Sequence, residues 1–145
     1  MPMTSAERVH RAMFDALMAH DLGAFTKLYD PNGLYRFADG EIEQRATRGF
    51  AAVEDQLAAL SNISIVIEHL HSPSDDVSIA EAHATAIHDG APLIDPIDGR
   101  PIPATGRQLD IDMCNIIEVR NGLVWMEREY YNTATFKRQL SQAGP

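Results

Sequence analysis

Apolar side chains recur with the period of an α-helix over the first part of the chain. Val9, Met13 and Leu17 are spaced four residues apart, which places them on one side of a helix. Residues 49–60 repeat this kind of spacing. The pattern therefore predicts two amphipathic helices within the first 60 residues.

A shorter helix is expected between these two. Asp21 is a typical N-cap residue, and Tyr29 would lie on the buried side of the helix that follows. Residues 30–33, with the sequence Asp-Pro-Asn-Gly, would end this helix, because proline and glycine favour turns. Residues 34–49 are expected to be extended, with a bend at 38–40.

The hydrophobic period then changes to that of strands. Residues 90–107 hold four of the eight prolines and predict a long loop, whereas β-branched or alternating runs predict strands at 63–71, 77–89, 109–120 and 123–131. Residues 72–76 would connect the first pair, and Asn121-Gly122 is a strong hairpin signal between the second. Residues 132–145 would close the chain as a short helix or strand. Helices followed by strands predict one α+β domain over 1–145, with three N-terminal helices against one face of a curved, mixed or antiparallel sheet.

Side-chain alternation assigns an interior face to the strand 109–120. One parity holds Ile111, Met113, Ile117 and Val119, and Asn115 lies in the middle of this apolar series. The opposite parity is mostly polar and includes Cys114. An amide within an apolar stripe is either a structural hydrogen-bonding group or part of a site.

The next strand does not divide cleanly into two faces. Glu127 and Glu129 share a parity with Trp125 and Tyr131, and Met126 lies on the other. Two alternatives follow. Either both glutamates are solvated and Met126 is in the core, or the glutamates and the aromatic residues line a wet pocket.

The earlier hairpin adds further candidates. His69 and His71 would continue the apolar face of residues 63–67, whereas Glu81 and His83 share a face about 7 Å apart along their strand. An ionised glutamate is costly to bury unless it is paired or hydrogen-bonded. If that face is interior, these two residues form either a satisfied polar cluster or an acid–base site.

Composition narrows the possible partners. The 145 residues carry a formal net charge of −9, which argues against binding to nucleic acid or to an anionic membrane surface. The single cysteine, Cys114, excludes an internal disulfide and is typical of a reducing compartment. No apolar run approaches the length of a membrane span. We therefore expect a cytoplasmic protein with a small-molecule partner.

Two segments carry a family resemblance. "PATGRQLDIDMCNIIEVRNGLVWMEREYYNTATFKRQL" and "HDLGAFTKLYDPNGLYRF" resemble the SnoaL-like polyketide cyclases, which belong to the nuclear-transport-factor-2-like superfamily. The resemblance implies a cone, in which a strongly bent sheet wraps around three helices and encloses a pocket. It also implies a homodimer formed through the outer sheet face, with no cofactor and no metal.

The resemblance transfers functional residues only in part. Asn115 matches the position where the family usually has an aspartate that reaches into the pocket. The general base of ketosteroid isomerase, another superfamily member, would fall near Phe37, and the helix-1 aspartate of dehydratase relatives would fall at Met18. None of these positions holds a carboxylate, which argues against a copied mechanism.

These residues form a set of candidate roles. Asn115 could donate a hydrogen bond to a developing enolate, an interaction that contributes roughly 3–4 kcal/mol, or it could be a structural amide. Glu127, Glu129 or His83 could then move the proton. Walls of the binding site are expected at Tyr29, Tyr35, His69, Glu81, Met113, Trp125 and Tyr131.

The sequence thus favours a cofactor-independent SnoaL-like enzyme. It would cyclise, isomerise or dehydrate a small, apolar, carbonyl-bearing ligand by proton abstraction. The alternative is a non-catalytic ligand-binding or dimerisation module with the same fold, which the missing family aspartate favours.

Overall fold

The fold is known from a computed structural model that describes residues 2–36, 44–95 and 98–141. The predicted bend at 38–40 and the position Phe37 lie outside these residues. The helices are α1 (Ser5–Met18), α2 (Leu22–Thr26), α3 (Ala46–Ala59) and α4 (Thr133–Ser141). The strands are β1 (Tyr29–Arg36), β2 (Gln44–Arg45), β3 (Leu60–Ser74), β4 (Val77–His88), β5 (Leu93–Ile94), β6 (Pro101–Ile102), β7 (Gln108–Arg120) and β8 (Leu123–Tyr131).

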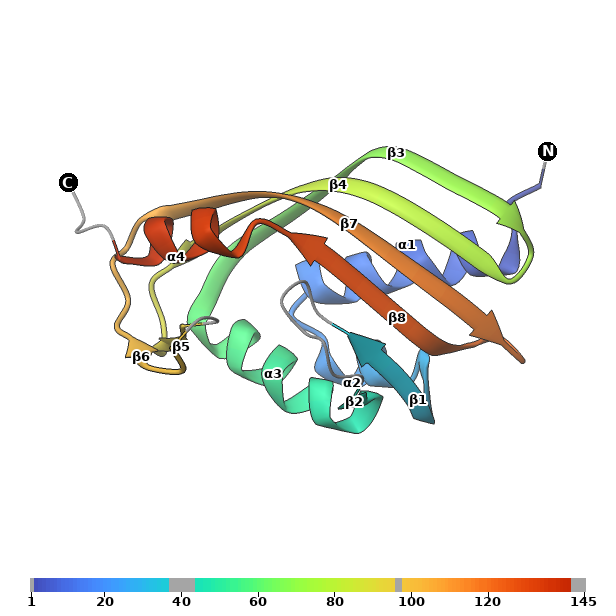
Figure 1. Cartoon of the computed structure of the whole chain (residues 1–145), viewed down its shortest axis with the longest axis horizontal. Helices are drawn as coiled ribbons and strands as arrows, with labels where there is room; N and C mark the ends of the chain where they lie inside the picture. The colour runs from blue at the N-terminus through green and yellow to red at the C-terminus, as the bar shows by residue number, and fades with distance from the viewer. Residues whose placement is uncertain (1, 37–43, 96–97, 142–145) are drawn as a thin grey trace.

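The long strands form a curved, open sheet that arches over the helices (Figure 1). Over the described ranges its six strands have the order β2-β1-β8-β7-β4-β3, and β5 pairs with β6 separately. β1 runs parallel to β8, whereas the other neighbours are antiparallel. The predicted α+β class with a strongly curved mixed sheet is confirmed, and a fourth helix closes the chain after β8.

Helix α1 begins at Ser5, directly after the N-cap residue Thr4. The Thr4 hydroxyl accepts a hydrogen bond from the Glu7 backbone N–H at 3.0 Å, and Thr-x-x-Glu is the sequence of a capping box. Val9 and Met13 are buried as the periodicity predicts. α1 therefore packs its apolar side against the sheet.

The region after α2 differs from the prediction. Asp21 does cap α2 by accepting from the Ala24 N–H, but Tyr29 begins β1 and residues 30–33 belong to that strand. Gly33 permits a close approach of the chain to β8, because a Cβ atom there would lie only 3.0 Å from the Val124 carbonyl oxygen. The pairing with β8 passes over this segment, since Tyr29 pairs with Val124 and Leu34 with Met126, so residues 30–33 form an irregular stretch within β1.

Both predicted hairpins are present. Asn121 and Gly122 have φ values of 54° and 78°, the left-handed conformation that a tight two-residue turn between β7 and β8 requires. β3 and β4 form the other hairpin, in which β3 continues to Ser74. The segment 90–107 is largely a loop, as predicted, but it also contains β5 and β6.

The interior face of β4 is the one with small side chains. Ser78, Ala80, Ala82 and Ala86 are buried, whereas Glu81 is exposed. The alternative that places Glu81 and His83 inside is therefore wrong. Small residues suit this face because α1 packs across β3, β4 and β7, and short side chains let a helix approach closely.

A register shift also turns the β3 histidines outward. Ile67 pairs with Ala82 on the interior side, but His69 pairs with Glu81, so the extra residue between them reverses the alternation. The predicted continuation of the apolar face through His69 and His71 is wrong for this reason.

The main apolar core lies between the helices and the middle of the sheet. It contains Met13 from α1, Phe25 from α2, Val53 from α3 and Ile117 from β7. A second cluster joins Leu109 to Leu140 of α4. Throughout the described residues, no helix has the length and apolar character needed to cross a membrane.

Candidate active site

An irregularity in β8 turns two glutamates toward the helices. Val124 pairs with Val119 and Met126 with Glu118, so Trp125 is an additional residue in β8. Such a bulge reverses the alternation of side chains beyond it. Glu127 and Glu129 consequently lie opposite Ile117 and Asn115 on the interior face. This bulge explains why the alternation of residues 123–131 did not assign one interior face. Met126 is buried, and yet Glu127 and Glu129 also face the helices.

A chain of hydrogen bonds connects α1 to four strands of the sheet, β4, β7, β8 and β1. The Nδ2 group of Asn115 donates to Oε2 of Glu127 at 2.8 Å, and the Tyr29 hydroxyl donates to Oε1 of the same carboxylate. Asn115 Oδ1 lies 2.7 Å from Nε2 of His10. His10 Nδ1 in turn lies 2.7 Å from the Ser78 hydroxyl. Asn115 thus joins a buried histidine to a cavity carboxylate.

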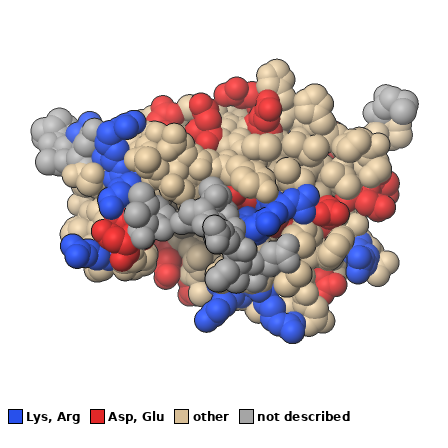
Figure 2. All heavy atoms as spheres, viewed as in Figure 1, with Lys and Arg blue, Asp and Glu red and all other residues tan. Residues whose placement is uncertain are grey.

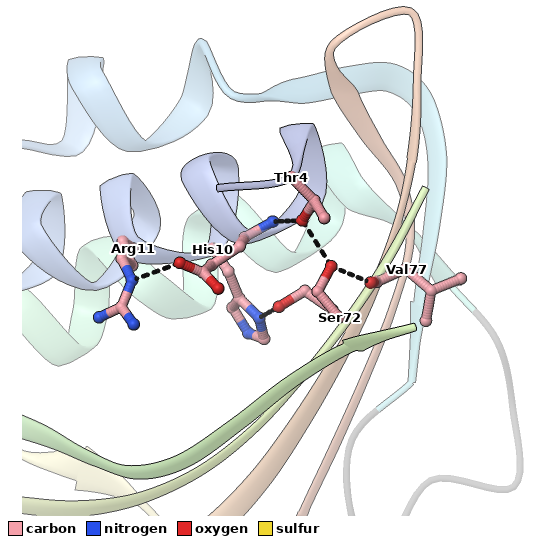
Figure 3. A network of polar contacts seen from close by, with 7 residues as sticks. Thr4, His10, Arg11, Ser72 and Val77 are labelled. Atoms are coloured by element: carbon pink, nitrogen blue, oxygen red, sulfur yellow. Dashed lines mark hydrogen bonds and ion pairs between the residues drawn. The ribbon is translucent and has the colours of Figure 1, made fainter. Parts of the chain in front are cut away.

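The donors in this chain all point toward Glu127. Because the Asn115 amide nitrogen donates to Glu127, its oxygen must accept from His10, which makes Nε2 the protonated ring nitrogen. Nδ1 then accepts from Ser78. Burial lowers the pKa of His10 to about 4, so the ring is neutral near pH 7. Figure 3 shows His10 projecting from α1 toward the strands, beside contacts that join Thr4, Ser72 and Val77.

His10 was not among the sequence candidates. Its spacing to Ala6, Met13 and Phe14 places it on the buried side of α1, and that signal could have found it. The candidate histidines chosen from the sequence were those in β3 and β4, which face away from the helices.

Glu127 and Glu129 differ in their surroundings. Burial raises the pKa of Glu127, but the hydrogen bonds from Tyr29 and Asn115 oppose this rise because they stabilise the carboxylate. Burial, together with the nearby charge of Glu127, raises the pKa of Glu129 to about 8. Within the described part of the chain, the Glu129 carboxyl forms no hydrogen bond. The hydrogen bonds from Tyr29 and Asn115 therefore favour the carboxylate form of Glu127, whereas a pKa of about 8 keeps Glu129 mostly protonated at neutral pH.

Both glutamates line a cavity of about 60 Å3, which we call the polar chamber. Tyr29, Tyr35, Met113 and Asn115 also line it, together with apolar residues of α1 and α3. Four of the predicted wall and site residues, besides the two glutamates, are thus brought together. Burial raises the pKa of the Tyr29 hydroxyl well above its ordinary value, and the Glu127 charge adds to this shift. Tyr29 is therefore a proton donor to Glu127 throughout the neutral range.

The other predicted residues lie elsewhere. Tyr131 lines a second cavity. Trp125 instead contacts the Arg120 guanidinium, which lies 4.1 Å from the ring centroid. His69 and Glu81 are exposed on the sheet face opposite the helices, which we call the open face.

His83 also lies on the open face. The alternation of side chains along β4 places it on the side of the sheet opposite Glu127 and Glu129. Its ring nitrogens are 2.8 Å from Asp110 and 2.7 Å from Asp112, and the hydrogen bond to Asp112 raises its pKa. Figure 2 shows acidic side chains along the upper edge of the view, where β3, β4 and β7 run. His83 is thus part of an exposed acidic surface and not of the polar chamber.

One group of residues has the spacing of metal ligands. Glu68, His83 and Asp112 present ligand atoms within 4.8 Å of one another on the open face, but exposed acidic groups are common without a metal ion. Among the residues that the structure describes, this group contains no side chain of the polar chamber. The absence of a metal or cofactor from the reaction stays a prediction.

The sequence profile of the SnoaL-like domain family matches residues 10–126. The chain belongs to this family. The match includes His10, Asn115 and the start of β8, and it ends just before Glu127. The sequence-based recognition is confirmed. No curated protein has significant similarity to this SnoaL-like sequence.

Solved structures share the fold of this SnoaL-like protein at low identity. A provisionally assigned SnoaL-like polyketide cyclase from Jannaschia sp. CCS1 is 16% identical with a TM-score of 0.77, covering 100% of this chain and 97% of its own. AclR, a provisionally assigned hydroxylase from Streptomyces galilaeus, is 16% identical with a TM-score of 0.76 and coverage of 93% and 94%. An LEH-like epoxide hydrolase from M. tuberculosis is 16% identical with a TM-score of 0.70 and coverage of 96% and 92%. At this identity the similarity establishes the fold alone.

Proposed function

We propose that this SnoaL-like protein is a cofactor-independent enzyme that moves a proton beside the carbonyl group of a small, largely apolar ligand. Cyclisation, isomerisation and dehydration all begin with this step. Glu127 would be the general base and Glu129 the general acid. His83, the remaining sequence candidate for proton transfer, lies on the open face and has no part in the proposal.

The single observation that carries the proposal is the pair of adjacent carboxyl groups in unequal environments. Glu127 accepts hydrogen bonds on both oxygens. Glu129, two residues further along the same strand face, is buried beside the charge of Glu127 but has no hydrogen-bond donor among the described residues. Groups whose surroundings separate their pKa values can divide the roles of base and acid between them. A Glu129 pKa of about 8 keeps its proton available at neutral pH.

The proposed step balances within these two groups. The C–H bond next to the carbonyl breaks, its proton passes to the Glu127 carboxylate, and the electron pair forms the carbon–carbon double bond of an enolate. The negative charge develops on the carbonyl oxygen, which the neutral Glu129 O–H stabilises by a hydrogen bond or by proton donation. Removing one such donor typically costs about 100- to 1,000-fold in rate.

Asn115 acts in this proposal as a positioning residue. Its amide nitrogen donates to Glu127 and its oxygen accepts from His10, so the group holds the base in place. The oxyanion-donor role expected from the sequence is assigned to Glu129 instead. Members of the fold with provisional cyclase assignments support an acid–base function but do not identify the substrate.

The proposal is tested by hydrogen–deuterium exchange at carbon. Cyclohexanone in D2O would be incubated with the protein, and loss of the signal of the hydrogens next to the carbonyl would be followed by NMR. We expect exchange above the buffer rate, and a decrease of about 100-fold or more in Glu127→Gln, because general base catalysis typically contributes that much. Glu129→Gln should also lower the rate.

Glu81→Gln is the matched control. It makes the same chemical change on an exposed residue of the open face and should leave the exchange rate unchanged. Exchange that survives in both Glu127→Gln and Glu129→Gln would contradict the proposal.

The second candidate is a ligand-binding module without catalysis. Asn115 at the family's aspartate position favours it, because an amide cannot exchange a proton at neutral pH. Binding of cyclohexanone without exchange above the buffer rate would establish this alternative. A cytoplasmic location, which rests on the single cysteine, and a homodimer formed through the open face, which rests on the family, are further proposals.

A further inference from the structure

A second cavity lies next to the polar chamber and has fewer polar side chains in its lining. It measures about 180 Å3, and we call it the apolar chamber. Its walls come from the concave side of β3, β4 and β7 and from α4, and they include Ile63, Ile65, Ala84, Leu109, Ile111 and Phe136. Such walls offer an apolar group a dry surface but offer a polar group few partners.

The two chambers share part of their lining. Leu17, Gln56, Met113 and Glu129 border both of them. Glu129 therefore stands at the boundary, with the anchored Glu127 on the polar side and aliphatic side chains on the other. Gln56, which borders both chambers from α3, is also exposed to solvent.

We propose that the two chambers form one bipartite substrate site, in which a carbonyl head occupies the polar chamber and a single-ring or short-chain apolar body occupies the apolar chamber. The assignment of the head rests on the proposed function. The assignment of the body rests on the shape and chemistry of the apolar chamber alone.

The volumes set the size of the substrate. A dry cavity of about 150 Å3 lined by apolar side chains accommodates benzene, so the apolar chamber accommodates one ring or a chain of about six to eight carbons. The polar chamber, at about 60 Å3, has room for only a few atoms beyond those of the carbonyl group. The substrate class is thus a monocyclic or short-chain ketone or aldehyde, and a four-ring ketone is too large.

A homologous series of methyl ketones tests this assignment. Affinities from acetone to 2-undecanone would be measured by ligand-observed NMR. We expect affinity to rise about fourfold for each added methylene, as for burial in an apolar site, and to stop rising at about six to eight carbons beyond the carbonyl. A steroid ketone should not bind.

Two variants change the chamber in opposite directions. Ala84→Leu fills it and should abolish the rise for longer ketones, whereas Ile63→Ala enlarges it and should move the plateau to longer chains by about two carbons. Ala51→Leu is the matched control, because it adds the same volume on an exposed position of α3 and should not alter the series. Affinity that does not depend on chain length in the native protein, or a series unaltered in both chamber variants, would overturn the assignment.

The test of the bipartite site can fail or succeed independently of the test of the proposed function. Glu127→Gln should stop deuterium exchange but keep the dependence of affinity on chain length, since Glu127 borders the polar chamber only. A length dependence without any exchange in the native protein would refute the catalytic proposal and support the apolar chamber. Deuterium exchange of acetone, together with an affinity that does not depend on chain length, would support the catalytic proposal and refute the assignment of the apolar chamber.

Discussion

At the scale of single residues, two identical side chains acquire different chemistry within one strand. Tyr29 and Asn115 solvate the Glu127 carboxylate, but Glu129 lacks comparable donors among the described residues. The neutral His10 completes the arrangement because it orients the Asn115 amide. Hydrogen-bond partners, and not the residue type, decide which glutamate holds a proton.

The raised pKa of Glu129 predicts that stability depends on pH in a definite direction. An unfolded glutamate has a pKa of about 4.3, so between there and about 8 the folded state retains a proton that the unfolded state releases. The free energy of unfolding should therefore fall as the pH rises through this window, by at most about 1.4 kcal/mol for each pH unit.

Urea denaturation at about pH 5 and about pH 8 measures this effect. The fall in stability between the two pH values should be smaller in Glu129→Gln, which cannot lose the proton, than in the native protein. The stability of the Glu81→Gln variant, which changes an exposed residue of the open face, should fall between the two pH values by as much as that of the native protein. An equal fall in Glu129→Gln and the native protein would show that Glu129 titrates in its ordinary range.

The proposed activity should decline as the pH rises through about 8, because Glu129 then loses its proton.

At the scale of elements, irregular strands decide which side chains reach the cavity. The bulge at Trp125 brings Glu127 and Glu129 inward, and the register shift after Ile67 sends His69 outward. Close packing at the end of α3 helps to hold the chamber walls. The backbone N–H groups of Gly90 and Ala91 donate to the carbonyls of Ala59 and Ala58, at 3.0 and 3.1 Å.

The contact at Gly90 predicts a large effect of a small substitution. A Cβ atom at Gly90 would lie 2.3 Å from the Ala58 carbonyl oxygen, so the backbone would have to shift. Gly90→Ala should lower the free energy of unfolding by roughly 1–3 kcal/mol, as overpacking does. Gly23→Ala is the control, since its Cβ would have ordinary contacts within α2 and should be neutral or stabilise by up to about 1 kcal/mol. Equal stabilities of the two variants in chemical denaturation would contradict this account.

At the scale of the whole molecule, the two faces of the sheet have different surroundings. The helices cover one face, and the open face combines exposed acidic groups with Val66 and Tyr130, which are 57% and 42% exposed. The family resemblance makes this open face the expected homodimer interface. Like charges facing one another across a two-fold axis would repel, so added salt should strengthen association.

Sedimentation equilibrium tests the expected dimer. Val66→Glu should weaken self-association because it adds a like charge to an acidic interface, whereas Ile94→Glu, at a 55% exposed position in β5, should not. A monomer mass for the native protein at all concentrations would refute the interface.

Sequence reasoning succeeded where the determinants are local. The helical spacing of Val9 and Met13, the capping by Asp21 and the Asn121-Gly122 turn depend on neighbouring residues, and all three are present in the structure. The parity of β7 was also sufficient to place Asn115 inside, because β7 pairs with β4 without a register shift and the extra residue in its pairing with β8 belongs to β8. The resemblance in the C-terminal third identified the family.

Tertiary structure decided what depends on distant partners. His10 meets Ser78 and Asn115 across 68 and 105 residues, and no local pattern encodes these contacts. The faces of β3 and β8 depend on single extra residues that shift the pairing register, and a one-residue shift exchanges inside for outside. The sequence by itself therefore determined the long helices and strands, the fold class and the interior position of Asn115. Only the packed sheet determined which carboxyl groups share the cavity with it, because burial and hydrogen bonding arise between strands and helices and not within them.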